Sequence, residues 1–292
     1  PIRLSYGYLK ETGDMTAFDD QWVAAMRLVV KTFREQQRFH GAGPYTFQRN
    51  TAWATDGVPM GGYGYPAKPN GLICSMFRPS DDATIYPYLI PSNYFAVESL
   101  LQLEEILTRK GGLEQDARAA KSLAVQVSEA LKAHAITQHP KYGKILAYET
   151  NGFGSFNLMD DANVPSLLSL PYLGAMKATD PLYKQTRNYV LSLDNPFYFK
   201  GTKLAGTGGP HIGLDMVWPM SIVMQGLTSQ DDKEIAYCLN SLTHCHAGTG
   251  FMHESAHKDD PANFTRKWFA WANTIFGEFV WKVYREKPAL LQ

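Results

Sequence analysis

Apolar residues recur at intervals of three and four along several segments of the chain, which is the spacing of one face of an α-helix. In the clearest of them Ala96, Leu100, Leu103 and Leu107 form one stripe, with Ser92 placed to cap the start and two glycines to end it. Strand-like alternation is sparse, so the pattern predicts an all-α protein. The predicted helices cover residues 20–38, 92–109, 113–134, 164–176, 180–192, 212–227, 231–244 and 265–285.

The connections between these helices alternate in length. A few residues join some neighbours, whereas residues 40–91, 138–163, 194–211 and 247–264 form long loops. Short connections imply antiparallel helical hairpins, and hairpins packed side by side place every long loop on one face. Hairpins arranged in a ring would form an α/α toroid with its active site on that face. We therefore expect one toroidal domain over residues 1–292, although eight helices make only part of a six-hairpin ring.

The composition narrows the choice of partners. The chain has 292 residues, 45% of them hydrophobic, and its 28 Lys and Arg balance its 28 Asp and Glu. A neutral chain without a basic run gives no electrostatic reason to expect nucleic acid or an anionic membrane as a partner. No apolar stretch is long enough to cross a bilayer, and none has the flanks of a signal peptide. Because the sequence starts at Pro1, its N-terminus does not distinguish a cytoplasmic from an exported protein.

The cysteines predict neither a disulfide framework nor a metal site. Cys74, Cys238 and Cys245 are odd in number and contain no Cys-x-x-Cys pair. We expect buried free thiols.

The first long loop is unusually rich in aromatic residues. Flat aromatic faces suit the apolar faces of sugar rings, but the same residues could also pack beneath the loop as a small satellite core. The sequence leaves both possibilities open. The residues concerned are Tyr45, Phe47, Trp53, Tyr63, Tyr65, Phe77, Tyr86 and Tyr88.

Polar side chains on the second long loop would suit a hydroxyl-rich ligand, but they could also serve as caps and turn formers, with Asn163 as the cap of the following helix. Each sugar hydroxyl both donates and accepts, so carboxylates and amides are suitable partners. The glycine cluster at residues 206–209 lacks the lysine and the spacing of a phosphate-binding loop. The polar set on the second loop comprises Glu149, Asn151, Asp160, Asp161 and Asn163.

The fourth loop contains a match to the zinc-binding pattern His-Glu-x-x-His at His253, Glu254 and His257. That pattern binds zinc only on a helix, where residues four apart share one face. Gly248 and Gly250 precede it and Pro261 follows, which leaves no room for a useful helix. We expect a loop glutamate offered to the cavity as a base, with a zinc-dependent hydrolase as the alternative.

Four longer strings of the chain are distinctive: RPSDDATIYPYLIPSNYF, YETNGFGSFNLMDDANVPSLLSLPYLG, GTGGPHIGLDMVWPMSI and FMHESAHKDDPANFTRKWFAWANTIFGE. Together they resemble one enzyme family, the exo-α-1,6-mannosidases of glycoside hydrolase family 125. The similarity extends from near residue 44 to residue 278, most of the chain. The resemblance implies an (α/α)6 toroid that removes terminal α-1,6-linked mannose from N-glycan-type oligosaccharides with inversion and without a metal or cofactor. Family members are longer at the N-terminus, so early helices of the ring are expected to be missing here.

The resemblance also implies the site residues. The general acid falls in the Ser80-Asp81-Asp82 string and is assigned to Asp81, with Asp82 as the alternative, and the general base falls on Glu254. In inverting enzymes these carboxyl groups stand roughly 6.5–9.5 Å apart, so that a water fits between base and sugar. We further expect Arg78 to pair with Asp82 and to leave Asp81 to the substrate. The residues implied to hold the terminal mannose are Arg78, Asp82, Asp160, Asp161, Asn163, His211 and His253.

Two points remain open. Trp218 and Trp268 are weaker candidates for the site, because tryptophans in predicted helices are more often part of a core. A toroid that binds mannosides without cleaving them is a further alternative.

Overall fold

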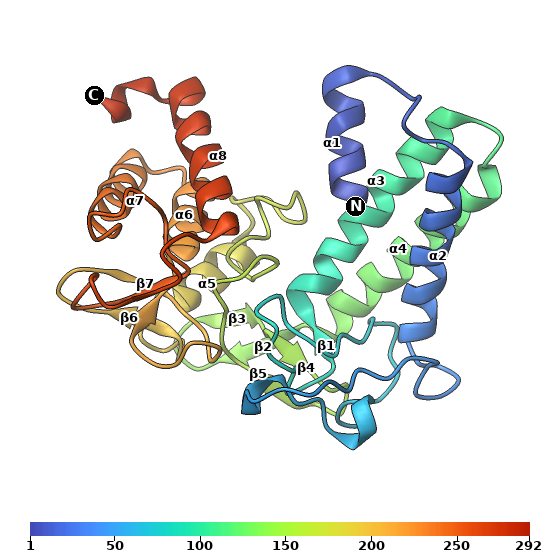
Figure 1. Cartoon of the computed structure of the whole chain (residues 1–292). Coiled ribbons are helices and arrows are strands. Elements are labelled where there is room, and N and C mark those ends of the chain that lie inside the picture. Colours follow the sequence, from blue (N-terminus) through green and yellow to red (C-terminus); the bar gives the residue numbers. More distant parts are fainter.

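Two groups of helices stand on a shared base of loops and short strands in the computed structural model, which describes residues 1–292, the side chain of Ala54 excepted (Figure 1). The first group is α1 (Ile2–Thr12), α2 (Asp20–Gln36), α3 (Ile90–Lys110) and α4 (Glu114–His134). The second is α5 (Pro181–Val190), α6 (Pro219–Leu227), α7 (Asp232–His244) and α8 (Ala270–Glu286). Short 3-10 turns add η1 (Ala54–Asp56), η2 (Met60–Gly62) and η3 (Pro288–Leu291).

The predicted hairpins are present where two apolar stripes face each other. Helices α3 and α4 pack antiparallel, with Leu100 and Leu103 buried against a face of α4 that carries Ala120 and Ala124. Small alanines allow two helices to approach closely. Gly111, with φ of 77°, ends α3 in a conformation that favours glycine. Helices α6 and α7 form a second contacting pair.

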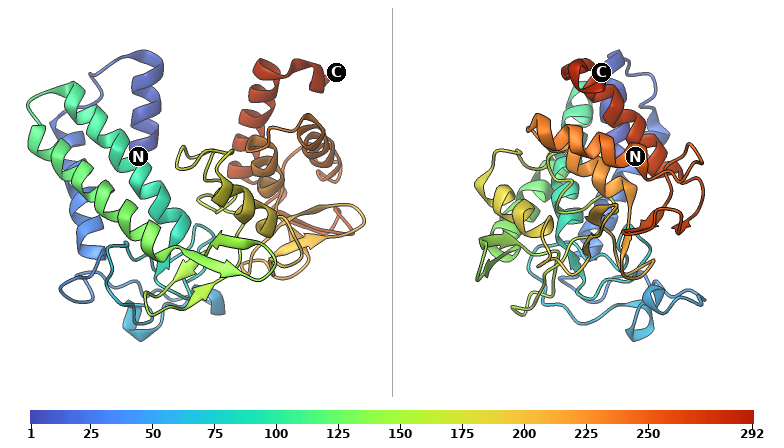
Figure 2. Two further views of the ribbon diagram at one scale, coloured as in Figure 1. Left: turned by 180° about the vertical axis from the view of Figure 1, so that it is seen from behind. Right: turned by 90° about the vertical axis from the view of Figure 1, so that its left-hand side faces the viewer.

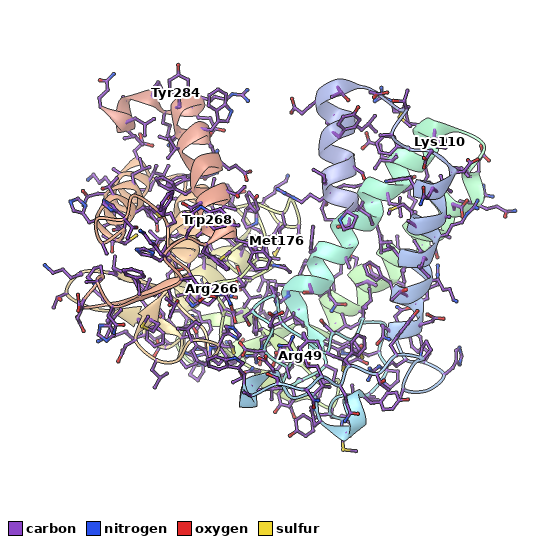
Figure 3. All side chains as sticks on the ribbon, in the orientation of Figure 1. Arg49, Lys110, Met176, Arg266, Trp268 and Tyr284 are labelled. Carbon is purple, nitrogen blue, oxygen red and sulfur yellow. The ribbon has the colours of Figure 1, made fainter. Side chains whose placement is uncertain are left out.

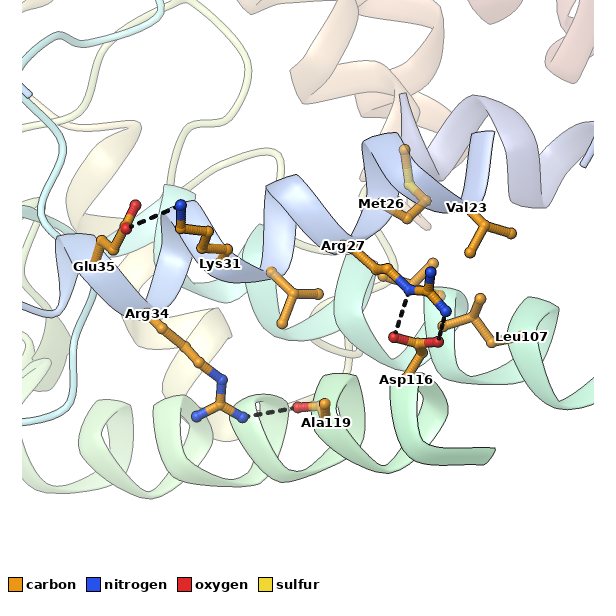
Figure 4. A pocket seen from close by; sticks show the side chains of 11 residues that line it. Val23, Met26, Arg27, Lys31, Arg34, Glu35, Leu107, Asp116 and Ala119 are labelled. Atoms are coloured by element: carbon orange, nitrogen blue, oxygen red, sulfur yellow. Dashed lines mark hydrogen bonds and ion pairs between the residues drawn. The ribbon is translucent and has the colours of Figure 1, made fainter. Parts of the chain in front are cut away.

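Helix α2 packs across the α3–α4 hairpin through apolar contacts and an ion pair. A groove of about 340 Å³ lies between the three helices, lined by Val23, Met26 and Leu107 among others (Figure 4). At its edge the guanidinium of Arg27 donates two hydrogen bonds, of 2.9 and 2.7 Å, to the carboxylate of Asp116 on α4. This bidentate pair fixes how α2 crosses α4.

The strands are two to four residues long, and all of their pairings are antiparallel. They lie in the base, where they tie together loops that are far apart in the sequence (Figure 2). One sheet has the order β1 (Tyr88–Leu89), β4 (Glu149–Thr150), β5 (Phe156–Asn157). Another has the order β10 (Phe264–Thr265), β9 (Ser255–His257), β8 (Met216–Val217). Two hairpins add β2 (Ile136–His139) with β3 (Gly143–Leu146), and β6 (Tyr198–Lys200) with β7 (Ala205–Thr207).

One hydrophobic core joins the two helix groups. The main cluster of buried side chains runs from Ile2 in α1 to Val283 in α8, and it includes Leu89, Val217 and Ala256 from the two three-stranded sheets. The three cysteines are buried and free, as predicted. No helix among the described residues is long and apolar enough to cross a membrane.

Some helix predictions were wrong. Residues 164–176 form turns, because the Asp160 carboxylate binds the N–H groups of Leu167 and Leu168, at 2.8 and 3.0 Å, and because Pro171 has no N–H of its own. Helix α6 starts at Pro219, since Met216 and Val217 pair with β9. Ser92 is no cap.

Helix α3 begins instead at Ile90, with Pro91 in its first turn. Helix α1 was not predicted; it buries only Ile2 and Leu9, too few residues for a visible stripe.

Candidate active site

A cleft of about 490 Å³ lies where the long loops meet. This volume is in the range of small-molecule sites. Each of the four long loops contributes at least one wall residue, as the hairpin architecture predicts. The lining residues are Pro79, Ser80, Asp81, Asn163, His211, Trp218, Glu254, Arg266, Trp268, Phe269, Ala270 and Trp271.

Asp81 lies at the tip of a tight turn. Phe77 and Ala83 form an antiparallel bridge, and the Arg78 N–H donates to the carbonyl of Asp82 at 2.7 Å while the Asp81 N–H donates to the carbonyl of Arg78 at 3.1 Å. This is a three-residue hairpin loop whose last residue must be left-handed, and Asp81 has φ of 74°. Aspartate tolerates that conformation better than most residues. The carboxylate is exposed to the cleft and makes no hydrogen bond to another described residue.

Asp82, the alternative acid, is committed to its neighbours. It is 1% exposed, accepts from the Ser80 hydroxyl at 2.8 Å, and lies 3.4 Å from Nδ1 of His211. Asp56 completes the cluster: a carboxylate oxygen of Asp56, one of Asp82 and a ring nitrogen of His211 all lie within 4.8 Å of one another. Asp56 also forms an ion pair with Arg49. Of the two acids, only Asp81 lines the cleft.

The expected pairing of Arg78 with Asp82 was wrong. Nε of Arg78 donates to Oε1 of Glu149 at 2.7 Å, and both side chains are buried, at 3% and 0% exposure. Burial opposes the cation, but the bond to Glu149 and its charge raise the pKa of Arg78 above its usual value. The error arose because the β1–β4 pairing, which no local pattern announces, brings Glu149 beneath the turn.

The polar residues of the second loop divide into two kinds. Asp160 is fully buried outside the cleft, where burial raises its pKa to about 7 against the opposing effect of the N–H groups it binds. Asn163 reaches the cleft, and its N–H and amide both donate at 2.9 Å to Oδ1 of Asp161. Burial also raises the pKa of Asp161. Oδ2 of Asp161 and Oδ1 of Asn163 are buried without a partner among the described residues.

Glu254 enters the cleft from the opposite end of the sequence. Its N–H donates to the carbonyl of Thr265 at 3.3 Å beside β9 and β10, and its side chain is 4% exposed. Nε of Arg266 lies 3.3 Å from Oε1 of Glu254. Arg266 has φ of 43° and its guanidinium lies over Phe269, 5.7 Å from the ring centroid. Arg266 and Trp268 lie at the lower end of α8 (Figure 3). Arg266 was not among the predicted site residues.

The residues of the zinc pattern do not form a zinc site. Residues 255–257 are strand β9, so the two imidazoles do not share a helix face. Nδ1 of His253 lies 2.9 Å from the carbonyl of Lys267 and its Nε2 lies 3.1 Å from that of His246, while Phe264 stacks on the ring at 3.8 Å. His253 is therefore fully buried and held by backbone, outside the cleft wall.

Aromatic rings form much of the remaining wall. Trp218 is buried and packs edge-on against Phe269 at 5.8 Å, whereas Trp268 is 57% exposed. The aromatic residues of the first loop differ in exposure: Tyr88 is fully buried in the main core, whereas Trp53 is 61% exposed and its ring stacks with that of His211, with the centroids 6.1 Å apart.

Comparison with known proteins assigns the chain to a family. The family model of the metal-independent alpha-mannosidases (GH125) matches residues 1–281. The chain belongs to this family. GH125 membership agrees with the resemblance found in the sequence, and the family's description as metal-independent counts against the zinc-hydrolase alternative.

Two relatives document the similarity. The Meiotically up-regulated gene 157 protein of Schizosaccharomyces pombe is 44% identical, with 100% of this chain and 59% of that protein covered. A metal-independent alpha mannosidase of Streptococcus pneumoniae, solved in a non-productive complex with alpha-1,6-mannobiose, superposes with a TM-score of 0.95 at 39% identity. That match covers 98% of this chain and 68% of the other. The chain thus spans about three fifths of the curated relative's length, and its fold is that of the GH125 α/α toroid.

Proposed function

We propose that this chain hydrolyses terminal α-1,6-linked mannose from N-glycan-type oligosaccharides, with inversion and without a metal. The observation that carries the proposal is that two carboxylates from distant loops, Asp81 and Glu254, line the same cleft. A pair of carboxyl groups is the machinery that glycoside hydrolysis needs. The complex of the pneumococcal relative with alpha-1,6-mannobiose supports the substrate class.

The two carboxyl groups have different tasks. Asp81 donates its proton to the glycosidic oxygen as the bond from that oxygen to the anomeric carbon breaks. Glu254 accepts a proton from the water that attacks the anomeric carbon from the opposite face. The products are β-mannose and the shortened glycan, and both carboxyls recover their protonation states through solvent.

The remaining wall residues suit a single sugar ring. Asn163 and His211 offer hydrogen-bonding atoms to hydroxyls, and the aromatic rings of Trp218 and Trp268 offer flat faces. Arg78, Asp82 and Asp161 act from behind the wall, through Glu149, Ser80 and Asn163 respectively. Asp160 and His253 hold the backbone of their loops.

The decisive experiment follows α-1,6-mannobiose by proton NMR in excess EDTA. We expect β-mannose to appear first and then to mutarotate, and we expect Asp81→Asn and Glu254→Gln to release none. Initial α-mannose would refute inversion, and a loss of turnover on chelation would refute metal independence. Binding of the mannobiose without release, unchanged in Glu254→Gln, would identify a mannoside-binding protein instead.

A further inference from the structure

The side chain of Glu149 is a buried carboxylate that lies outside the cleft. It is 0% exposed and uses both carboxylate oxygens. Oε1 accepts from Nε of Arg78 at 2.7 Å. Oε2 accepts from the N–H groups of Ile85 and Tyr86, at 3.2 and 3.3 Å, and from Nδ2 of Asn157 at 2.9 Å.

Three of these four donors lie on either side of the turn that carries Asp81. Arg78 starts the turn, and Ile85 and Tyr86 lie a few residues after it, so one carboxylate binds the chain on both sides of the acid. Asn157 belongs to β5 and Glu149 to β4, the central strand of the sheet, which pairs with β1 on one side and with β5 on the other. The turn is thereby fixed to a sheet from a different long loop.

The network also explains why a charge is buried here. A carboxylate without partners is costly to bury, and an arginine is costly without a counter-charge. Arg78 has only Glu149 as its ion-pair partner among the described residues, and its Nη2 is buried without a hydrogen bond to any of them. Loss of the Glu149 charge therefore leaves the Arg78 cation uncompensated beneath the acid.

We propose that Glu149 is a positioning residue for the general acid: it holds the Arg78–Asp82 turn so that Asp81 meets the leaving oxygen. This inference rests on the proposed function. Glu149 does not line the cleft and touches no substrate. Its effect is confined to the step that needs the proton of Asp81.

A change of leaving group separates this role from a general structural one. Mannose leaving from α-1,6-mannobiose as an alkoxide needs a proton, whereas fluoride leaves from α-mannosyl fluoride without one. Displacement of the acid therefore slows hydrolysis of α-1,6-mannobiose and leaves hydrolysis of α-mannosyl fluoride almost unchanged. A distorted cleft slows both.

The test compares Glu149→Gln with wild type on both substrates. We expect kcat on α-1,6-mannobiose to fall about 10- to 100-fold, because a positioned acid contributes of the order of 10²–10⁴ to rate. On α-mannosyl fluoride we expect kcat to fall less than about threefold. The disparity between the two losses should be larger in Asp81→Asn than in Glu149→Gln, and smaller in Glu149→Asp. Equal losses on the two substrates would overturn the inference.

Glu234→Gln is the matched control. Glu234 also holds an arginine, Arg187, at 3.0 Å and accepts from Gln225 at 2.8 Å and from Ser229, but none of these residues lines the cleft. We expect no disparity between the substrates in this variant, and a disparity equal to that of Glu149→Gln would overturn the inference. Thermal unfolding checks that each variant is folded.

If Glu149→Gln does not fold, Asn157→Ala removes one donor and leaves the Glu149 charge in place. We then expect a disparity of about two- to fivefold, and equal losses again count against the positioning role. A wild-type chain that cleaves neither substrate would refute the proposed function itself, and the positioning role with it. An active wild type with proportionate losses in the variants would refute the positioning role alone.

Discussion

Arg266 holds Glu254 at the cleft wall, with its Nε 3.3 Å from Oε1 of the carboxylate. The two partners differ sharply in exposure, at 62% for the arginine side chain and 4% for the glutamate. The exposed guanidinium of Arg266 therefore pairs with the buried carboxylate of Glu254.

Replacement of Arg266 tests this relationship. Exposed pairs contribute less than about 1 kcal/mol, so we expect Arg266→Gln to lower kcat/KM on α-1,6-mannobiose about two- to fivefold. Arg266→Lys keeps the charge and should retain most activity. The advantage of wild type over Arg266→Gln should shrink in 0.5 M NaCl, where the Debye length is below about 8 Å. An unchanged advantage in high salt would exclude an electrostatic role.

Trp268 should contribute to binding rather than to chemistry. It is 57% exposed and lines the cleft, so its ring is available to a sugar face. We expect Trp268→Ala to raise KM about three- to tenfold with kcat within about twofold, since an aromatic contact contributes about 0.5–1.5 kcal/mol. Trp281→Ala is the control, because Trp281 is 59% exposed on α8 but does not line the cleft. Equal effects of the two substitutions would exclude a binding role for Trp268.

Asp160 should make stability depend on pH. Burial raises the pKa of Asp160 from 3.8 to about 7, so the folded protein binds this proton more tightly than the unfolded chain does. The stabilising contribution is full below pH 4 and is lost as the pH rises through 7. Between pH 5 and pH 8 the loss amounts to about 2–3 kcal/mol of unfolding free energy.

Denaturant titrations of wild type and Asp160→Asn at both pH values measure this contribution. The asparagine cannot ionise, so the difference in unfolding free energy between pH 5 and pH 8 should be smaller in the variant by that amount. A wild type and a variant with the same pH dependence would show that Asp160 titrates normally.

The glycine cluster of residues 206–209 should be needed for packing. A Cβ at Gly208 would lie 2.2 Å from the carbonyl oxygen of Met216 and 2.8 Å from the ring of Phe199. We expect Gly208→Ala to destabilise the protein by about 2 kcal/mol or more, because backbone and ring would both have to move. Gly7→Ala has open space on exposed α1 and should stabilise by about 0.5–1 kcal/mol. Calorimetry compares the two, and a neutral Gly208→Ala would show that strand β7 and its neighbours can shift.

The sequence predicts those helices that have a strong apolar stripe, but it did not identify their caps: the cap predicted at Ser92 was wrong, and the three aspartate caps were found only in the structure. Asp19 caps α2 by accepting from the N–H of Trp22 at 2.8 Å, and Asp180 and Asp231 cap α5 and α7 in the same way. The turns at residues 164–176 could not be predicted, because a side chain outside the segment, Asp160, takes its N–H groups. Strands of two residues carry no periodicity at all.

The candidate site also contains residues that could be predicted from the sequence and residues that could not. Asp81, Asn163, His211 and Glu254 line one cleft, and each lies in a string that resembles the family. Glu149 as the partner of Arg78 could not be predicted, because the two residues meet only through strand pairing across 71 positions. Arg266 lay in a recognised string, but only the hairpin of β9 and β10 brings it to Glu254.

The two sheets of the base carry one carboxylate each. Asp81 is anchored through Glu149 to the sheet of β1, β4 and β5, and Glu254 adjoins the sheet of β8, β9 and β10. Side chains of both sheets, Leu89 and Ala256 among them, belong to a single hydrophobic cluster. In the proposed mechanism, the room for the attacking water then depends on the interior that separates the sheets. A core substitution that shifts one sheet would slow hydrolysis while every cleft residue stays the same. Selection for turnover would then act on residues that never meet a sugar.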